Sequence, residues 1–209
     1  MKRLIYTIIV AFPLFYACTK DNFVYTGISN GRHEGKNMLE YMETDSYDWD
    51  STLLMIRHAG AEIVQLFEGK DAAHPEITFF GITNHSIRRY MLENGIKRVT
   101  DFDPAWCRDI LLRHVVDGKL YRRKIPEGKT GAYGTVGEGG MTLTSLAGTE
   151  IWAYTTIEET SGIKENAARH IFINFTNVNV QVAIASGDIE PDNCIVHALE
   201  YGFTLGDEE

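Results

Sequence analysis

The sequence predicts a single α+β domain, because helical patterns come first in the chain and strand patterns follow. Apolar residues recur at helical spacing through the first half. From Tyr121 onward the chain becomes rich in β-branched and aromatic residues, in short runs separated by Gly, Asn and Ser. With 209 residues, 44% of them hydrophobic, the chain is long enough to bury a sizeable core.

The first residues have a pattern typical of export. Lys2 and Arg3 precede an apolar run from Leu4 to Ala17 that is too short to span a bilayer, which predicts a signal peptide over residues 1–17. The run ends at Cys18, and this -FYAC- ending resembles a bacterial lipoprotein cleavage box, in which the cysteine carries lipid. Cleavage near Ala17 in an ordinary secreted protein is the alternative.

A lipid on Cys18 predicts a protein that is anchored to the outer membrane and exposed at the cell surface without crossing the bilayer. Residues 18–36 are expected to form a flexible tether, since they are polar, contain several glycines and show no sustained periodicity. Asp21, shortly after the cysteine, is similar to the acidic export tags of surface-exposed lipoproteins.

Helical patterns follow the tether. The predicted elements are a helix over 38–42, a helix from about 48–51 to 67, a strand over 77–80 and a helix over 84–92. Gly69 is expected to end the second helix, and Thr83 to cap the third. His58 has no partner at a metal-ligand spacing and is expected to be exposed.

The segment from Asp103 to Tyr121 predicts a core-facing helix that leads into the sheet. Asp103 is a suitable N-cap, Pro104 suits the first helical position, and Gly118 is a stop signal. Apolar residues recur between them at helical spacing, and His114 lies on this apolar face. A strand is expected to begin after Gly118.

Four later runs predict strands, and a glycine-rich stretch separates them from the helices. The strands are expected at 141–146, 150–157, 170–176 and 178–185, with Asn177 and Asn179 in a tight turn. Residues 127–140 contain six glycines, but they lack the Gly-Lys-Ser/Thr ending and the strand–loop–helix context of a phosphate-binding loop. We interpret this stretch as a mobile surface loop.

The charge balance argues against a nucleic-acid partner. The formal net charge is −9, and the densest basic run, Tyr121–Lys124, is interpreted as a solvated strand edge. The chain has three cysteines and no Cys-x-x-Cys pair, so a redox or zinc motif is not expected. Cys107 lies on an apolar helix face, so we expect it to be a buried free thiol.

Three segments together resemble the signatures of fasciclin-like domains. ITFFGITN, starting at Ile77, resembles the first signature; LLRHVVDG, starting at Leu111, is similar to the central one; and DI followed by NCIVHALE, starting at Asp188, resembles the last. They occur in the family's order and at roughly its spacing. The residues that carry the resemblance are Thr78, Phe79, Thr83, Asn84, His114, Asp188, Asn193 and His197.

The resemblance implies a fold and a class of function. It implies a β-sandwich wedge flanked by several helices over residues 37–205, with an acidic tail at 206–209, and a binding or adhesion role. The chain departs from the family pattern at Gly81, at Arg113 in place of Tyr, and at Cys194 in place of Gly. Arg113 puts integrin adhesion of the animal relatives in doubt. The implied fold also brings Cys107 and Cys194 near each other, which leaves a disulfide between them open.

Two interpretations remain open for the paired histidines. His114 and His197 fall in apolar runs, so each is expected to be a buried ring that hydrogen-bonds to the backbone and locks helix to sheet. The alternative is a ligand-contacting or pH-responsive pair.

Catalytic and metal-binding motifs are absent from the sequence. It contains no His-Glu-x-x-His pair and no Gly-x-Ser-x-Gly elbow, so no catalytic residue, metal site or cofactor is predicted. A hydrolase using two of the 29 acidic residues stays an alternative. The leading prediction is non-enzymatic adhesion to a surface glycan, matrix or protein partner. A second is an accessory glycan-binding component of a polysaccharide-uptake system, with sugar stacking by Tyr133, Trp152 or Tyr154.

Overall fold

The computed structural model describes residues 31–157 and 169–209. The predicted signal peptide, Cys18 and most of the predicted tether lie outside the described residues. Folded structure begins earlier than expected, because residues 31–33 of the predicted tether form a strand of the main sheet. Within the described part of the chain, no helix has both the length and the apolar character needed to cross a membrane.

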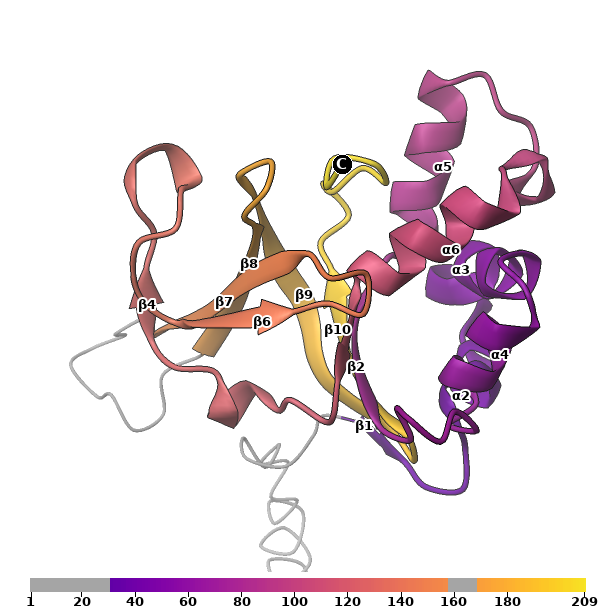
Figure 1. The fold of residues 1–209 in the computed structure, drawn as a ribbon, viewed down its shortest axis with the longest axis horizontal. Coiled ribbons are helices and arrows are strands. Elements are labelled where there is room, and N and C mark those ends of the chain that lie inside the picture. The colour runs from indigo at the N-terminus through magenta and orange to yellow at the C-terminus, as the bar shows by residue number, and fades with distance from the viewer. Residues whose placement is uncertain (1–30, 158–168) are drawn as a thin grey trace, which may run out of the picture.

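Five α-helices gather on one side of a curved sheet (Figure 1). They are α2 (Met38–Thr44), α3 (Ser46–His58), α4 (Ala61–Phe67), α5 (Asn84–Glu93) and α6 (Pro104–Arg113). Local sequence explains their starts. Asn37 and Glu40 form a reciprocal capping box at α2, and the Asp103 carboxylate accepts from the Ala105 and Trp106 N–H groups at α6.

Two helix predictions need correction. The single helix expected from residues 48–51 to 67 is divided into α3 and α4, because Gly60 adopts φ +115°, which is incompatible with a continuous helix. The expected helix after Pro104 ends at Arg113, earlier than Gly118. His114 is its C-cap, and strand β3 (Val115–Asp117) begins at the next residue. No strand follows Gly118 directly; a short 3-10 helix, η3 (Arg122–Lys124), comes next.

The remaining strands form one main sheet and a small hairpin. The main sheet has the order β3-β2-β10-β9-β8-β7-β6, and β1 also pairs with β9. A single hydrogen-bonded path therefore connects all of these strands, and a sandwich of two separate sheets is not confirmed. The strands are β1 (Gly31–His33), β2 (Ile77–Gly81), β6 (Met141–Thr144), β7 (Glu150–Ile157), β8 (Arg169–Phe175), β9 (Val180–Pro191) and β10 (Cys194–Leu199).

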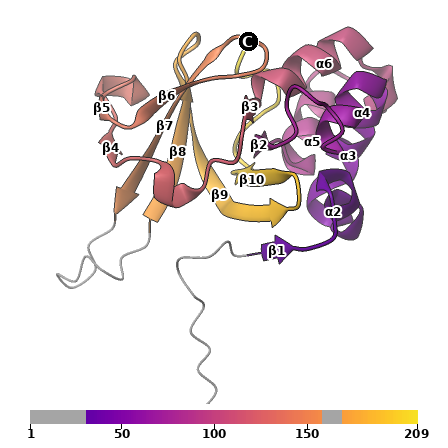
Figure 2. The same cartoon turned by 60° about the horizontal axis from the view of Figure 1, so that its bottom comes forward.

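The hairpin consists of β4 (Gly128–Lys129) and β5 (Glu138–Gly139), with the 3-10 helix η4 (Ala132–Gly134) between them. The hairpin occupies the glycine-rich stretch that the sequence predicts to be a surface loop. Figure 2 shows it on the side of β6 and β7 that faces away from the helices. Glycine is required at Gly137, where an added Cβ would collide with the Lys129 carbonyl. The short 3-10 helix η2 (Val99–Asp101) precedes α6.

The sheet separates two hydrophobic cores. Phe79 packs with the helices, edge-on to Phe67 at 5.0 Å, whereas its neighbour Phe80 belongs to the core enclosed by the curved sheet. Successive strand residues point to opposite faces, so β2 is buried on both sides. Cys107 and Cys194 are both buried free thiols, and burial raises the pKa of Cys107 to about 12.

Candidate functional site

Two buried asparagines from the sequence motifs hold the helices in place: Asn84 joins α5 to α3, and Asn193 joins the sheet to α2 and α4. Asn84 accepts from the Ser51 N–H at 2.6 Å and donates to the Ser46 and Tyr47 carbonyls at 2.9 and 2.7 Å. Asn193, in the turn between β9 and β10, accepts from the Met38 N–H at 2.9 Å and donates to the Phe67 carbonyl at 3.0 Å. Asn193 satisfies backbone groups at the ends of α2 and α4, and Asn84 satisfies backbone groups in the first two turns of α3, which are structural roles.

The two motif threonines are also buried. Thr78 on β2 donates to the Gly118 carbonyl at 2.6 Å and accepts from the Leu120 N–H at 2.8 Å, so it closes the turn after β3. Thr83 occupies the predicted N-cap position of α5, but its hydroxyl makes no capping bond and has no partner among the described residues.

His114 lies wholly buried between β2 and the C-terminal segment. Its Nδ1 is 3.1 Å from the Phe80 carbonyl, and its Nε2 is 3.2 Å from Oε1 of Glu208. The second contact is within ion-pair distance, but its alignment does not meet the geometry of a hydrogen bond. Glu208 belongs to the predicted acidic tail, yet its side chain is fully buried.

His197 holds a distortion in the sheet. Its Nδ1 accepts from the Asp188 N–H at 3.3 Å, so Nε2 carries the proton and donates to the Leu120 carbonyl at 2.9 Å. Burial lowers the pKa of His197, which favours the neutral ring that this pattern requires. Both rings contact backbone groups of neighbouring segments, His114 at Phe80 and His197 at Asp188 and Leu120.

Gly187 and Asp188 form a β-bulge opposite His197. Ile189 pairs with Val196, and Ser186 pairs with Ala198. Gly187 and Asp188 on β9 therefore lie opposite the single residue His197 on β10. Asp188 has φ +59°, and its carboxylate accepts from the Arg122 N–H at 2.7 Å. A further shift lies between Ser186 and Ile184. Because bulges bend a strand, β9 turns away from β8 here.

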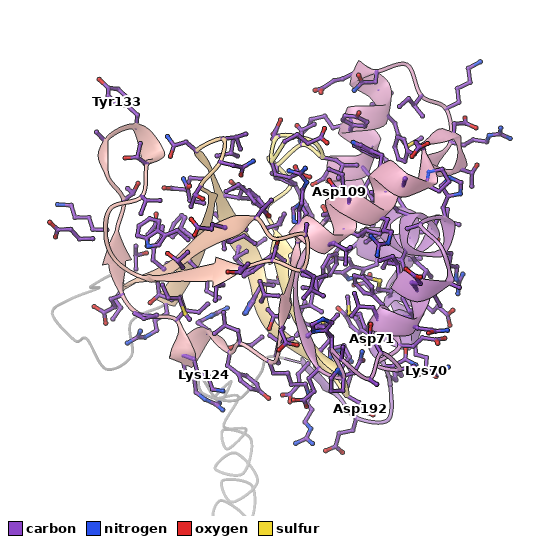
Figure 3. All side chains as sticks on the ribbon, viewed as in Figure 1. Lys70, Asp71, Asp109, Lys124, Tyr133 and Asp192 are labelled. Atoms are coloured by element: carbon purple, nitrogen blue, oxygen red, sulfur yellow. The ribbon has the colours of Figure 1, made fainter. Side chains whose placement is uncertain are left out.

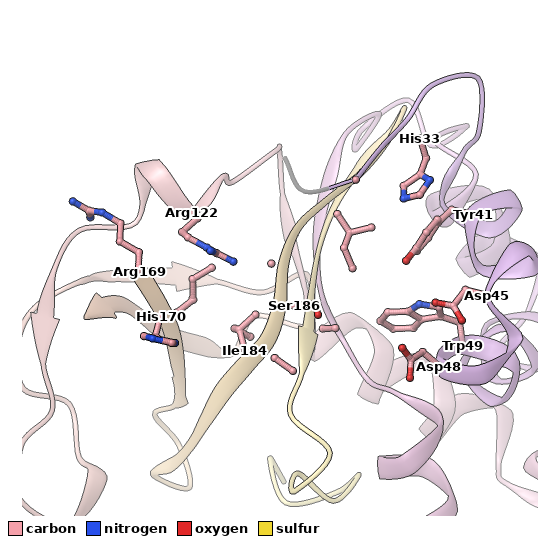
Figure 4. Close-up of a pocket in the computed structure, with 16 residues that line it drawn as sticks. His33, Tyr41, Asp45, Asp48, Trp49, Arg122, Arg169, His170, Ile184 and Ser186 are labelled. Carbon is pink, nitrogen blue, oxygen red and sulfur yellow. The ribbon is translucent and has the colours of Figure 1, made fainter. Parts of the chain in front are cut away.

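A pocket with a cavity volume of about 460 Å³ lies beside this bend. Figure 4 shows β9 running between its two walls. One wall consists of Arg122, Arg169 and His170, from η3 and β8, and the other of His33, Tyr41, Asp45, Asp48 and Trp49, from β1 and the α2–α3 region. The walls therefore differ in charge, one basic and one acidic with aromatic rings.

Two charged groups of the pocket, Arg169 and Asp48, have side-chain partners among the described residues. Arg169 is 3.3 Å from Glu127, and Asp48 accepts from the Tyr201 hydroxyl at 2.8 Å, which raises the pKa of Tyr201 to about 12. Arg122 differs. Its Nε is buried without a hydrogen-bond partner, and no carboxylate of residues 31–157 or 169–209 lies within ion-pair distance of its guanidinium.

Comparisons with known proteins support the fold only at the structural level. No protein-family model matches the sequence, and no curated protein matches it. A search of solved structures matches the FAS1 domain pair of the insect cell adhesion molecule fasciclin I, with a TM-score of 0.50 and 13% identity over 77% of this chain. The fold is fasciclin-like. The match covers 46% of that structure, so this chain spans about half its length.

Within this fasciclin-like fold, the three sequence signatures meet along β2, β10 and the bulge of β9. Phe79 lies on β2, His114 contacts the Phe80 carbonyl of the same strand, and His197 on β10 faces the bulge. The motif residues thus shape the pocket indirectly, by holding the bend in β9. The described residues contain no group of three His, Cys, Asp or Glu side chains that could hold a metal ion.

The three aromatic residues considered for sugar stacking have different environments. Trp152 and Tyr154 are each only 2% exposed and stack on one another at 4.4 Å, so neither presents a ring face at the surface. Tyr133 is fully exposed at the tip of the β4–β5 hairpin, with φ +56° (Figure 3). A stacking surface in this fasciclin-like domain can thus include Tyr133 and excludes the other two.

Sequence reasoning missed the residues that line the pocket. Tyr41 and Trp49 have the helical spacing of ordinary core residues, and both are mostly buried. Arg122 belongs to the basic run that was interpreted as a solvated strand edge; it instead projects from η3 toward β9 (Figure 4). No local pattern identifies these residues, because the bend of β9 brings together segments that are far apart in sequence.

Proposed function

We propose that this protein is a non-enzymatic binding domain displayed at the cell surface, where it mediates adhesion to a glycan, matrix or protein partner. The observation that carries the proposal is the solvent-open pocket, whose walls differ in charge and whose frame is fixed by buried hydrogen bonds. The fasciclin-like fold supports it, since the similar solved structure is from a cell adhesion molecule.

The test is attachment of bacteria that export the full chain to surfaces coated with purified polysaccharides or purified matrix proteins. We expect more cells to attach than with an empty vector. Ser186→Trp should remove most of this attachment, because it places a large ring at an exposed position of the pocket. Leu92→Trp is the matched control, since Leu92 is 83% exposed and lies outside the pocket. Equal attachment by vector cells on every surface would disprove the proposal.

The proposed address is the outer membrane, through lipid on Cys18. Cells grown with labelled palmitate should incorporate label into the wild-type chain, and Cys18→Ser should lose both the label and the membrane association. A Cys18→Ser chain that stays in the membrane fraction would contradict lipid anchoring without affecting the pocket.

A second candidate function is that of an accessory glycan-binding component of a polysaccharide-uptake system. Tyr133 favours it, because a fully exposed aromatic ring at a hairpin tip can stack on a sugar. Tyr133→Ala should then abolish binding to a glycan array while leaving the fold intact. An array on which the wild type and Tyr133→Ala give the same pattern would rule out this role for the hairpin.

A further inference from the structure

One edge of β9 changes partner part-way along its length. β10 pairs with β9 from Ile184 to Ile189. On the opposite edge, β8 pairs with β9 only as far as Ala183, and β1 begins at Ile189. Among the described strands, none pairs with residues 184–188 of β9 on that edge. Five residues of a strand correspond to a gap of about 17 Å.

The other side of this gap is formed by the first residues of β8. The Arg169–Ile171 end of β8 pairs with β7, yet the register of β8 with β9 begins only at Phe172. β8 and β9 therefore diverge here, and the pocket occupies the opening between them (Figure 4). Ala185 and Ser186 are exposed although they lie in the middle of a twelve-residue strand. Unpaired strand edges of this kind accept an added strand readily.

The guanidinium of Arg122, which has no ion-pair partner among the described residues, lies at this gap. A Cβ added to Gly187 would be only 2.7 Å from Nη2 of Arg122, so the two residues are in close contact. A buried Nε without a partner is costly, which favours a ligand that supplies an acceptor. A carboxylate suits a guanidinium best, because two parallel hydrogen bonds can form between them.

We propose that the gap between β8 and β1 binds an extended peptide segment of a partner protein, which adds to β9 as a strand and places an acidic side chain against Arg122. This inference rests on the proposed binding function and specifies its partner. Backbone N–H and C=O groups repeat along an open edge at the spacing of another strand, which a peptide matches. Asp45 and Asp48 on the opposite wall would repel a polyanionic glycan, whereas a peptide can carry a single acid.

The experiment uses the purified full chain on an array of immobilised eight-residue peptides. Each peptide has Glu, Gln or Lys at its centre, flanked by varied Val, Thr, Ile and Tyr residues. We expect binding to concentrate on peptides with a central Glu. Replacing alternate backbone N–H groups of a bound peptide by N-methyl should weaken binding at least about tenfold, because strand addition depends on those groups.

Arg122→Met should also weaken binding to the Glu peptides at least about tenfold, and it should remove their advantage over the Gln peptides. Lys124→Met, an exposed change on the same 3-10 helix, is the matched control and should bind like the wild type. Circular dichroism melting of both variants establishes that they fold.

Three outcomes would overturn the inference. They are the absence of binding to any peptide, binding that is indifferent to N-methylation, and equal binding by Arg122→Met. If cells still attach to coated surfaces in the first case, the proposed function stands and only the peptide partner is wrong. Oligouronates tested in parallel identify an acidic sugar as the occupant if they bind and the peptides do not.

Discussion

The buried interface between the elements of the fold differs from the opening beside β9 in how its polar side chains are paired. At the interface, Asn84, Asn193 and His197 each make two or three hydrogen bonds to the backbone. At the opening, Arg122 keeps a buried Nε without a partner, and two strand edges diverge. The side chains of the first region fix its geometry, although the Thr83 hydroxyl there has no partner among the described residues, whereas Arg122 at the opening offers a donor that a ligand can satisfy.

This difference suggests that stability and binding are divided between the two regions. Substitutions at the interface should reduce the free energy of unfolding, whereas a substitution at the opening should affect binding and leave stability almost unchanged. The following substitutions test that division.

The largest loss of stability is expected for Glu208→Ala. The change leaves His114 Nε2 buried without its acidic neighbour, so the free energy of unfolding should fall by about 3 kcal/mol. Glu208→Gln should lose much less, because a neutral amide of the same shape can donate to the ring. Urea denaturation gives both values. Equal losses for Ala and Gln would show that packing, and not the contact with His114, determines the effect.

A somewhat smaller loss is expected for Asn84→Ala. Removing the amide leaves the Ser51 N–H and the Ser46 and Tyr47 carbonyls without this partner, which should cost about 2 kcal/mol. Asn94→Ala is the control, since Asn94 is exposed and bonds only to Tyr90 in the same helix; it should cost less than about 0.5 kcal/mol. Comparable losses for both variants would contradict the special role of the interface.

Because of His197, we expect the free energy of unfolding to fall as the pH is lowered. The unfolded chain binds a proton near pH 6.5, while burial lowers the pKa of His197 in the folded state. The free energy of unfolding should therefore decrease as the pH drops through 6.5 toward the folded pKa. Burial also lowers the pKa of His33, which acts in the same direction. His197→Gln should weaken this dependence, and urea denaturation between pH 7.5 and 5 measures it; an unchanged slope would argue against His197 as its source.

The smallest effect on stability is expected for Arg122→Met. Because the guanidinium has no acceptor in residues 31–157 or 169–209, its removal should change the free energy of unfolding by less than about 0.5 kcal/mol or increase it. Arg89→Met is the contrasting variant, since Arg89 donates to the Tyr201 carbonyl at 2.6 Å and should lose about 1 kcal/mol. A larger loss of stability for Arg122→Met than for Arg89→Met would contradict the division of stability and binding between the two regions.

Local signals predicted the parts of the fold that local chemistry determines. The cap at Asp103, the strand at Ile77 and the helix after Thr83 lie where the sequence places them. The mixed helix and strand content and the fasciclin-like fold are confirmed. Gly60 was read as part of an apolar helix face, although its positive φ divides that helix. Periodicity alone cannot distinguish a glycine within a helix from one between two helices.

The pocket could not be predicted, because it depends on tertiary geometry. The shift in register at Gly187 and Asp188 arises from pairing with a distant strand, and a sequence does not display register. Arg122 was read with Arg123 and Lys124 as one solvated run, since neighbours in sequence look alike. Only the folded chain separates Arg122, with its buried Nε, from the exposed side chains of the other two.

Gly31 lines the pocket, so the polypeptide enters the domain at the pocket's rim. If Cys18 carries lipid as proposed, thirteen residues connect the bilayer to this rim. Even a fully stretched segment of that length spans at most about 45 Å. The pocket would then stay within reach of the headgroup layer, and proteins of the same membrane would meet it at high effective concentration. Proteins of the same membrane would therefore compete with external surfaces for the pocket.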